Sequence, residues 1–212
     1  MKKFSKGMSF DFDKESDHLR HIKVKLVWKY NKGENNNLKL DADLTLAVLQ
    51  TVGRNNNGDI VKNIFAEDEG YLVFYNSPLK DKINGDIWTP GKEIHHTGDC
   101  QTGEEGEEAD IFLDKLHQKA DEIPIIATIH KGEERNQNWG SLHGKLQIIN
   151  QVTGEILGEY DFGSEIPTAT ASHVGSIIRT ENGFKYESIG SGFNASLSQF
   201  IDNWTQEPDL PL

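Results

Sequence analysis

Residues 22–30 read IKVKLVWKY, and this stretch decides the fold class. Apolar and charged side chains alternate along it, which predicts a half-buried β-strand rather than a helix. The expected apolar face comprises Ile22, Val24, Leu26, Trp28 and Tyr30, and the opposite face carries Lys23, Lys25 and Lys29.

Similar short segments recur along the chain. Alternation returns over Leu38–Leu49, and short apolar runs at 71–75 and 123–130 each predict a strand. Two hairpins are expected, over 146–162 and 173–189, with turns at Thr153-Gly154 and Asn182-Gly183. Residues 79–110 are polar and are expected to be irregular. Many short strands without sustained βαβ alternation predict an all-β fold, an antiparallel β-sandwich with short helices.

The two ends of the chain differ from the middle. Leu197, Phe200, Ile201 and Trp204 follow helical spacing, which predicts a short C-terminal helix. That helix either packs on the sandwich or docks a partner. We therefore expect a flexible N-terminal segment over 1–21, the sandwich over 22–193, and a C-terminal helix with a frayed tail over 194–212.

Composition excludes several classes of partner. The chain carries 22 basic and 34 acidic residues, a net charge of −12, which repels nucleic acid and anionic membranes and attracts cations. No apolar stretch approaches the roughly 20 residues of a membrane span, so we expect no direct membrane insertion. Cys100 is the only cysteine, and the first residues show no apolar signal region. Both observations predict a cytoplasmic protein.

Residues 98–110 form an acidic segment that contains six carboxylates and three glycines but no basic residue. Calcium takes six to eight hard oxygen ligands in flexible geometry, which carboxylates and backbone carbonyls supply. The spacing does not fit an EF-hand. The segment therefore predicts a calcium site, with a solvated acidic loop as the alternative.

A second acidic feature lies on the strand at 38–49. Asp41 and Asp43 are two residues apart, so both side chains point to the same face, together with Thr45. Two acids on one face of an apolar strand are costly unless they are exposed or compensated. Either this face meets solvent, or a cation shared with the acidic segment compensates both carboxylates.

Four segments give the chain a family resemblance. It resembles the TerD group of tellurium-resistance and stress-response proteins. The fit is most specific in His96-Thr97-Gly98-Asp99 through Thr102-Gly103-Glu104 to Asp110, and in Thr128-Ile129-His130 through Arg135-Asn136-Gln137-Asn138-Trp139-Gly140. The other two segments are Leu40–Thr45, similar to the family's Asp-Leu-Asp strand, and Val73-Phe74-Tyr75-Asn76.

The resemblance implies a β-sandwich that binds Ca²⁺ at one end, without known catalysis. It implies a role in surviving tellurite or other chemical stress. Implied partners are other TerD-family or operon proteins and a membrane protein complex. The ligands implied by the acidic cluster and these segments are Asp41, Asp43, Asn76, Asp99, Glu104, Glu107, Glu108 and Asp110, with carbonyls from Gly98 or Gly103.

The chain departs from the family pattern in places. The Asp-Leu-Asp strand fits in two registers, one that keeps Asp41 and one that keeps Asp43. Cys100 stands where the family has Asn, and Ala109 removes an acid. One or two bound ions remain compatible with these changes.

Two other functions stay open. Eight histidines, with close pairs at His18/His21 and His95/His96, allow a zinc- or manganese-dependent hydrolase, although no His-Glu-x-x-His element is present. The acidic segment would also suit a metal-free module that grips a basic partner. The calcium interpretation treats Cys100, His95 and His96 as bystanders, because thiol and imidazole are poor calcium ligands.

Overall fold

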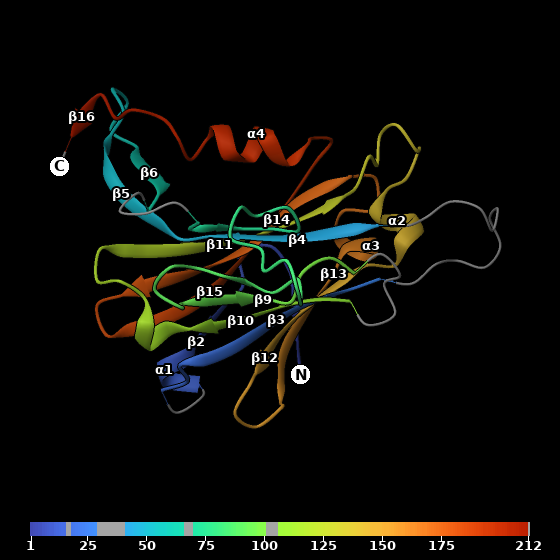
Figure 1. Ribbon diagram of the computed structural model, residues 1–212, viewed down its shortest axis with the longest axis horizontal. Coiled ribbons are helices and arrows are strands. Elements are labelled where there is room, and N and C mark those ends of the chain that lie inside the picture. Colours follow the sequence, from blue (N-terminus) through green and yellow to red (C-terminus); the bar gives the residue numbers. More distant parts are fainter. Residues whose placement is uncertain (16–17, 29–40, 66–69, 101–105, 212) are drawn as a thin grey trace.

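The computed structural model describes residues 1–15, 18–28, 41–65, 70–100 and 106–211 (Figure 1). Its strands form two sheets packed face to face, which confirms the expected sandwich. The first sheet runs in the order β1 (Lys2–Phe4), β13 (Ile156–Asp161), β12 (Lys145–Asn150), β3 (His21–Val27), β10 (Glu107–Phe112), β9 (Ile94–His96) and β8 (Ile87–Trp88).

The second sheet runs in the order β16 (Leu210–Pro211), β5 (Leu49–Arg54), β11 (Ala120–Ile129), β14 (Ala171–Thr180), β15 (Gly183–Phe193) and β2 (Ser9–Asp11). Three strands lie off this path. β4 (Ala42–Ala47) pairs with β11 and with β7 (Leu72–Val73), and β6 (Ile60–Ile64) pairs with β5. The pairings are antiparallel except for β1 with β13, which is parallel.

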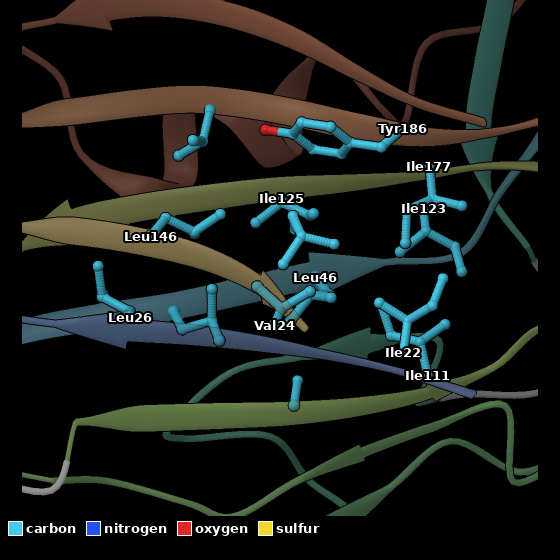
Figure 2. Close-up of a cluster of buried hydrophobic side chains, with 14 of the residues drawn as sticks. Ile22, Val24, Leu26, Leu46, Ile111, Ile123, Ile125, Leu146, Ile177 and Tyr186 are labelled. Atoms are coloured by element: carbon cyan, nitrogen blue, oxygen red, sulfur yellow. The ribbon is translucent and has the colours of Figure 1, made fainter. Parts of the chain in front are cut away.

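The apolar face expected of residues 22–30 is buried where the structure describes it. Ile22, Val24 and Leu26 are 0% exposed and belong to the core between the sheets. Figure 2 shows these side chains of β3 and those of β11 meeting in that space. Both expected hairpins are present, as β12–β13 and β14–β15. The alternation of apolar and charged residues and the turn signals therefore correctly predicted β3 and the two hairpins.

The N-terminal residues are not a loose segment, contrary to expectation. They contribute β1 to one sheet and β2 to the other, followed by the short helix α1 (Phe12–Glu15). Phe4, Phe10 and Phe12 are buried in the core. Strands of three residues are too short for alternation to reveal them, but the burial of three phenylalanines fixes this segment to both sheets.

The polar stretch at 79–110 is also more regular than expected, because its described residues contain β8, β9 and β10. These strands extend the first sheet from β3 through backbone pairing rather than through long apolar runs. At the other end, β16 pairs with β5, so the tail is not frayed there.

The remaining helical elements are short. The 3₁₀ helix η1 spans Leu113–Lys115, α2 spans Trp139–Leu142, and α3 spans Phe162–Glu165. The expected C-terminal helix is α4 (Leu197–Asp202), which lies over the second sheet (Figure 1). Phe200 packs there with Ile126 and Ala171 in a small cluster outside the main core. None of the helices within the described ranges is long and apolar enough to cross a membrane.

Candidate metal site

Three of the expected acids converge at one place. Asp41 directly precedes β4, Asp43 lies on that strand, and Asp99 follows β9 of the other sheet. One carboxylate oxygen from each lies within 4.8 Å of the others. The Asp41 carbonyl accepts a hydrogen bond from the His130 N–H at 2.8 Å, which fixes this end of β4 beside the end of β11. These three residues, Asp41, Asp43 and Asp99, form the acidic trio.

The trio concentrates negative charge where one member is buried. Asp43 is 4% exposed, and burial, together with the charges of Asp41 and Asp99, raises its pKa to about 7. Burial and the same three carboxylates also raise the pKa of Tyr75, which lies beside them. A cation bound among the three acids would offset both the repulsion and the desolvation. Clustered carboxylate oxygens are the donors that calcium and magnesium prefer.

Glu107, another expected ligand, points into the protein and bonds to backbone. Its Oε2 accepts the Leu44 N–H at 2.6 Å, and its Oε1 accepts the Cys100 N–H at 3.2 Å. It is 0% exposed. Burial above all raises the pKa of Glu107 to about 9, with Asp43 and Asp99 adding to the effect. Glu107 is therefore tied to the two segments that carry the acids, and it is not one of the three clustered carboxylates.

His96 lies beside Glu107 and is also fully buried. Its Nε2 is 3.0 Å from the Leu44 carbonyl oxygen, and its Nδ1 accepts the Gly98 N–H at 2.9 Å. Burial lowers the pKa of His96 to about 4, so the ring is neutral near pH 7. His96 was expected to be a bystander to the ion, and it is not one of the three clustered acids. It contacts the backbone directly after Asp43 and directly before Asp99.

Two glycines shape the chain around the acidic segment. Gly98 has φ +91°, and a Cβ there would lie 2.8 Å from the Gly85 carbonyl oxygen. Gly106 has φ +74°, and a Cβ there would lie 2.3 Å from the Leu26 carbonyl oxygen. Side-chain-bearing residues rarely adopt such φ values. Glycine is therefore required at both positions, directly before Asp99 and directly before Glu107.

Two expected ligands, Glu108 and Asp110, are not brought to the trio. Side chains alternate along β10, so Glu107 and Ala109 point inward while Glu108 and Asp110 point outward. Glu108 pairs with Lys23 and Lys25, both at 2.5 Å, and Asp110 lies 3.1 Å from the His21 Nε2. The structure therefore places both carboxylates with partners on β3 and apart from the three clustered acids.

The remaining expected ligands lie in different surroundings. Asn76 is exposed and lies three residues after the end of β7. Gly98 directly precedes Asp99 and is buried. Gly103 and Glu104 lie outside the described residues.

The histidines do not assemble a metal site within the described part of the chain. The trio is the one group there in which three or more metal-binding side chains converge, and it contains no histidine. His95 stacks on Trp88 with ring centroids 4.2 Å apart, and its Nε2 is 3.4 Å from Asp86. This arrangement gives the hydrolase alternative no support in the described residues.

Comparison with known proteins agrees with this architecture. A family model described as TerD domain matches residues 1–204. General stress protein 16U of Bacillus subtilis (strain 168) is 26% identical over 204 residues, which span 94% of this chain and 95% of that protein. Tellurium resistance protein TerD of Serratia marcescens is 24% identical over 198 residues, 92% of each chain. The crystal structure of a homologue of telluride resistance protein (TerD) from Streptomyces coelicolor A3(2) superposes with a TM-score of 0.60 at 16% identity, covering 86% of this chain and 95% of that one.

Proposed function

The chain belongs to the TerD domain family, and from that premise we propose that it is a non-enzymatic, calcium-binding stress-response protein. Relatives of similar length carry the names general stress protein and tellurium resistance protein. The observation that carries the calcium assignment is the convergence of Asp41, Asp43 and Asp99. The proposed site takes one ion between these three carboxylates.

The residues favour a stabilising role for the ion over a catalytic one. Asp43 lies on β4 of the second sheet with Asp41 directly before it, and Asp99 follows β9 of the first sheet. The three carboxylates come within 4.8 Å of one another and therefore repel. A calcium ion supplies positive charge there when bound, and its binding free energy then adds to the stability of the folded chain. The histidines of the described part of the chain do not converge on the trio, so a zinc- or manganese-dependent hydrolase gains no support from them.

The proposal extends to partners and location. We expect contacts with other TerD-family or operon proteins and with a membrane protein complex, as the family resemblance implies. The acidic balance disfavours direct contact with nucleic acid. A single cysteine suits the reducing cytoplasm.

Melting curves in calcium, magnesium and chelator test the proposed function. Calcium at about 100 times its Kd should add about 2.7 kcal/mol to the free energy of unfolding. Asp99→Ala should lose this gain. Asp114→Ala is the matched control, since Asp114 is an exposed acid on η1, and it should keep the gain. Equal melting temperatures for the wild type in calcium and in chelator would overturn the calcium assignment. A salt-sensitive interaction with a basic protein that ignores chelator would favour a metal-free acidic module instead.

A further inference from the structure

Two buried side chains join the chain segments on which the acidic trio is built. We propose that Glu107 and His96 form a clamp that holds Asp99 against Asp43, so that the calcium site is already assembled before the ion arrives. Both are positioning residues that act through backbone groups and not as ligands. The inference rests on the proposed calcium function, and part of its test does not depend on that function.

The first half of the clamp grips β4. On one edge, β4 pairs with β11 from Ala42 to Leu46. On its other edge, β7 pairs only with Leu46 and Ala47. On this second edge, the peptide groups of Leu44 contact side chains and not a neighbouring strand. The Leu44 N–H donates to the Glu107 carboxyl at 2.6 Å, and the Leu44 carbonyl oxygen lies 3.0 Å from the His96 Nε2. Leu44 directly follows Asp43, so this grip fixes the buried acid.

The second half of the clamp grips the residues on either side of Asp99. The Gly98 N–H donates to the His96 Nδ1 at 2.9 Å, and the Cys100 N–H donates to the Glu107 Oε1 at 3.2 Å. The backbone is thus held one residue before and one residue after the acid, whose own side chain is exposed. The same two side chains therefore set the position of Asp43 and of Asp99.

The geometry also assigns the ring tautomer of His96. Because Nδ1 accepts from Gly98, the ring hydrogen must be on Nε2, from which it donates to the Leu44 carbonyl. His96 Nε2 and Glu107 Oε2 are 3.6 Å apart, and both side chains are 0% exposed. Both side chains are hydrogen-bonded to backbone and buried, so they resist rearrangement, since breaking one of these bonds leaves a buried polar group without water.

Such a clamp is needed because the acids repel one another. In the ion-free protein, the three carboxylates lie within 4.8 Å, and their mutual repulsion would push the Asp99 segment away from β4. A site held in place loses less conformational freedom on binding and so binds more tightly. Removing an outer support of a metal site typically costs about 10- to 100-fold in affinity.

The first arm of the test uses nuclear magnetic resonance on the full chain in chelator. In the wild type, the Leu44 and Cys100 amides should be protected from hydrogen exchange, and His96 should show a protonated Nε2 and an unprotonated Nδ1. In Glu107→Gln, the side chain keeps one acceptor oxygen and places an NH2 donor where the other was, so exchange should rise at one of these two amides at least. The rise should be about 10-fold or more relative to the amides of β12, which report global stability. His96→Gln is a second variant that should release the Gly98 amide, because the glutamine amide reaches the position of Nε2 and leaves that of Nδ1 without an acceptor.

The second arm measures calcium affinity by calorimetry. Glu107→Gln should weaken binding by about 10- to 100-fold. Glu108→Gln is the matched control, because it makes the same chemical change one residue along β10 on the outward face. Its affinity should stay within about twofold of the wild type.

The outcomes separate the clamp from the calcium function. If the wild type binds no calcium while Glu107→Gln still releases the Leu44 or the Cys100 amide, the proposed function fails and the clamp stands. If the two amides exchange equally in both proteins, or His96 carries its hydrogen on Nδ1, the clamp is refuted whatever the calcium result. Equal calcium affinities for Glu107→Gln and the wild type would also refute it.

Discussion

Replacing Asp43 by asparagine should stabilise the ion-free protein at neutral pH and abolish its stabilisation by calcium. Asp43 is 4% exposed, and burial with the neighbouring Asp41 and Asp99 raises its pKa from the ordinary 3.8 to about 7. Asparagine has nearly the same size and carries no charge. The variant therefore keeps the packing of β4 and removes the cost of ionising a buried carboxyl.

The size and sign of the effect follow from the two pKa values of Asp43. Its pKa in the unfolded chain is near 3.8 and in the folded chain about 7, so between these values the folded state binds the extra proton. The free energy of unfolding then falls as pH rises through this window and levels off above it. The advantage of Asp43→Asn should be about 2 kcal/mol near pH 5.5 and about 4 kcal/mol near pH 7.5.

Urea unfolding in chelator, followed by tryptophan fluorescence at several pH values, measures this difference. Asp114→Asn serves as the control for the loss of one exposed negative charge. Adding calcium near neutral pH should stabilise the wild type and leave Asp43→Asn unchanged. A gain that does not grow between about pH 5.5 and pH 7.5 would refute the reasoning about Asp43. So would a variant that calcium stabilises as much as the wild type.

Three further predictions concern the framework of the site. Phe4→Ala should lower the free energy of unfolding by about 3–5 kcal/mol, because this ring is 2% exposed in the core. A urea midpoint equal to that of the wild type would instead support a loosely attached N-terminal segment. Gly106→Ala should cost about 1–3 kcal/mol or more, since its φ is +74° and a Cβ would lie 2.3 Å from the Leu26 carbonyl oxygen; unchanged thermal stability would contradict that geometry. Glu108→Gln should change stability by no more than about 1 kcal/mol, with a difference that shrinks in high salt, because its two lysine partners are partly exposed.

The sequence predicted the strands of the sandwich whose pattern is long enough to show. Alternation over 22–30 and the Asn-Gly turn at 182–183 each identified a real element, β3 and the β14–β15 hairpin. β1 and β2 were missed, since three residues with one buried phenylalanine each carry no readable period. β8 and β9 were missed because backbone pairing, and not an apolar run, defines them.

The site was predicted in part, and the errors follow from strand parity. Asp41, Asp43 and Asp99 were chosen from their chemistry, and the fold brings them together. Glu108 and Asp110 share that chemistry but lie on the outward face of β10. Which residues point outward depends on where the strand begins, at Glu107. The support from His96 could not be seen, because its hydrogen-bond partners are the backbone groups of Leu44 and Gly98 and no side-chain pattern marks them.

The placement of the trio across both sheets has a kinetic consequence. Asp41 and Asp43 are separated from Asp99 by more than fifty residues, so the cluster exists only after β4 and β9 have docked. Closing so long a loop comes late in folding, since its entropy must be lost before the contact forms. Calcium should therefore leave the refolding rate nearly unchanged and slow the unfolding rate. An ion bound at this place therefore lengthens the lifetime of the folded chain without increasing its folding rate.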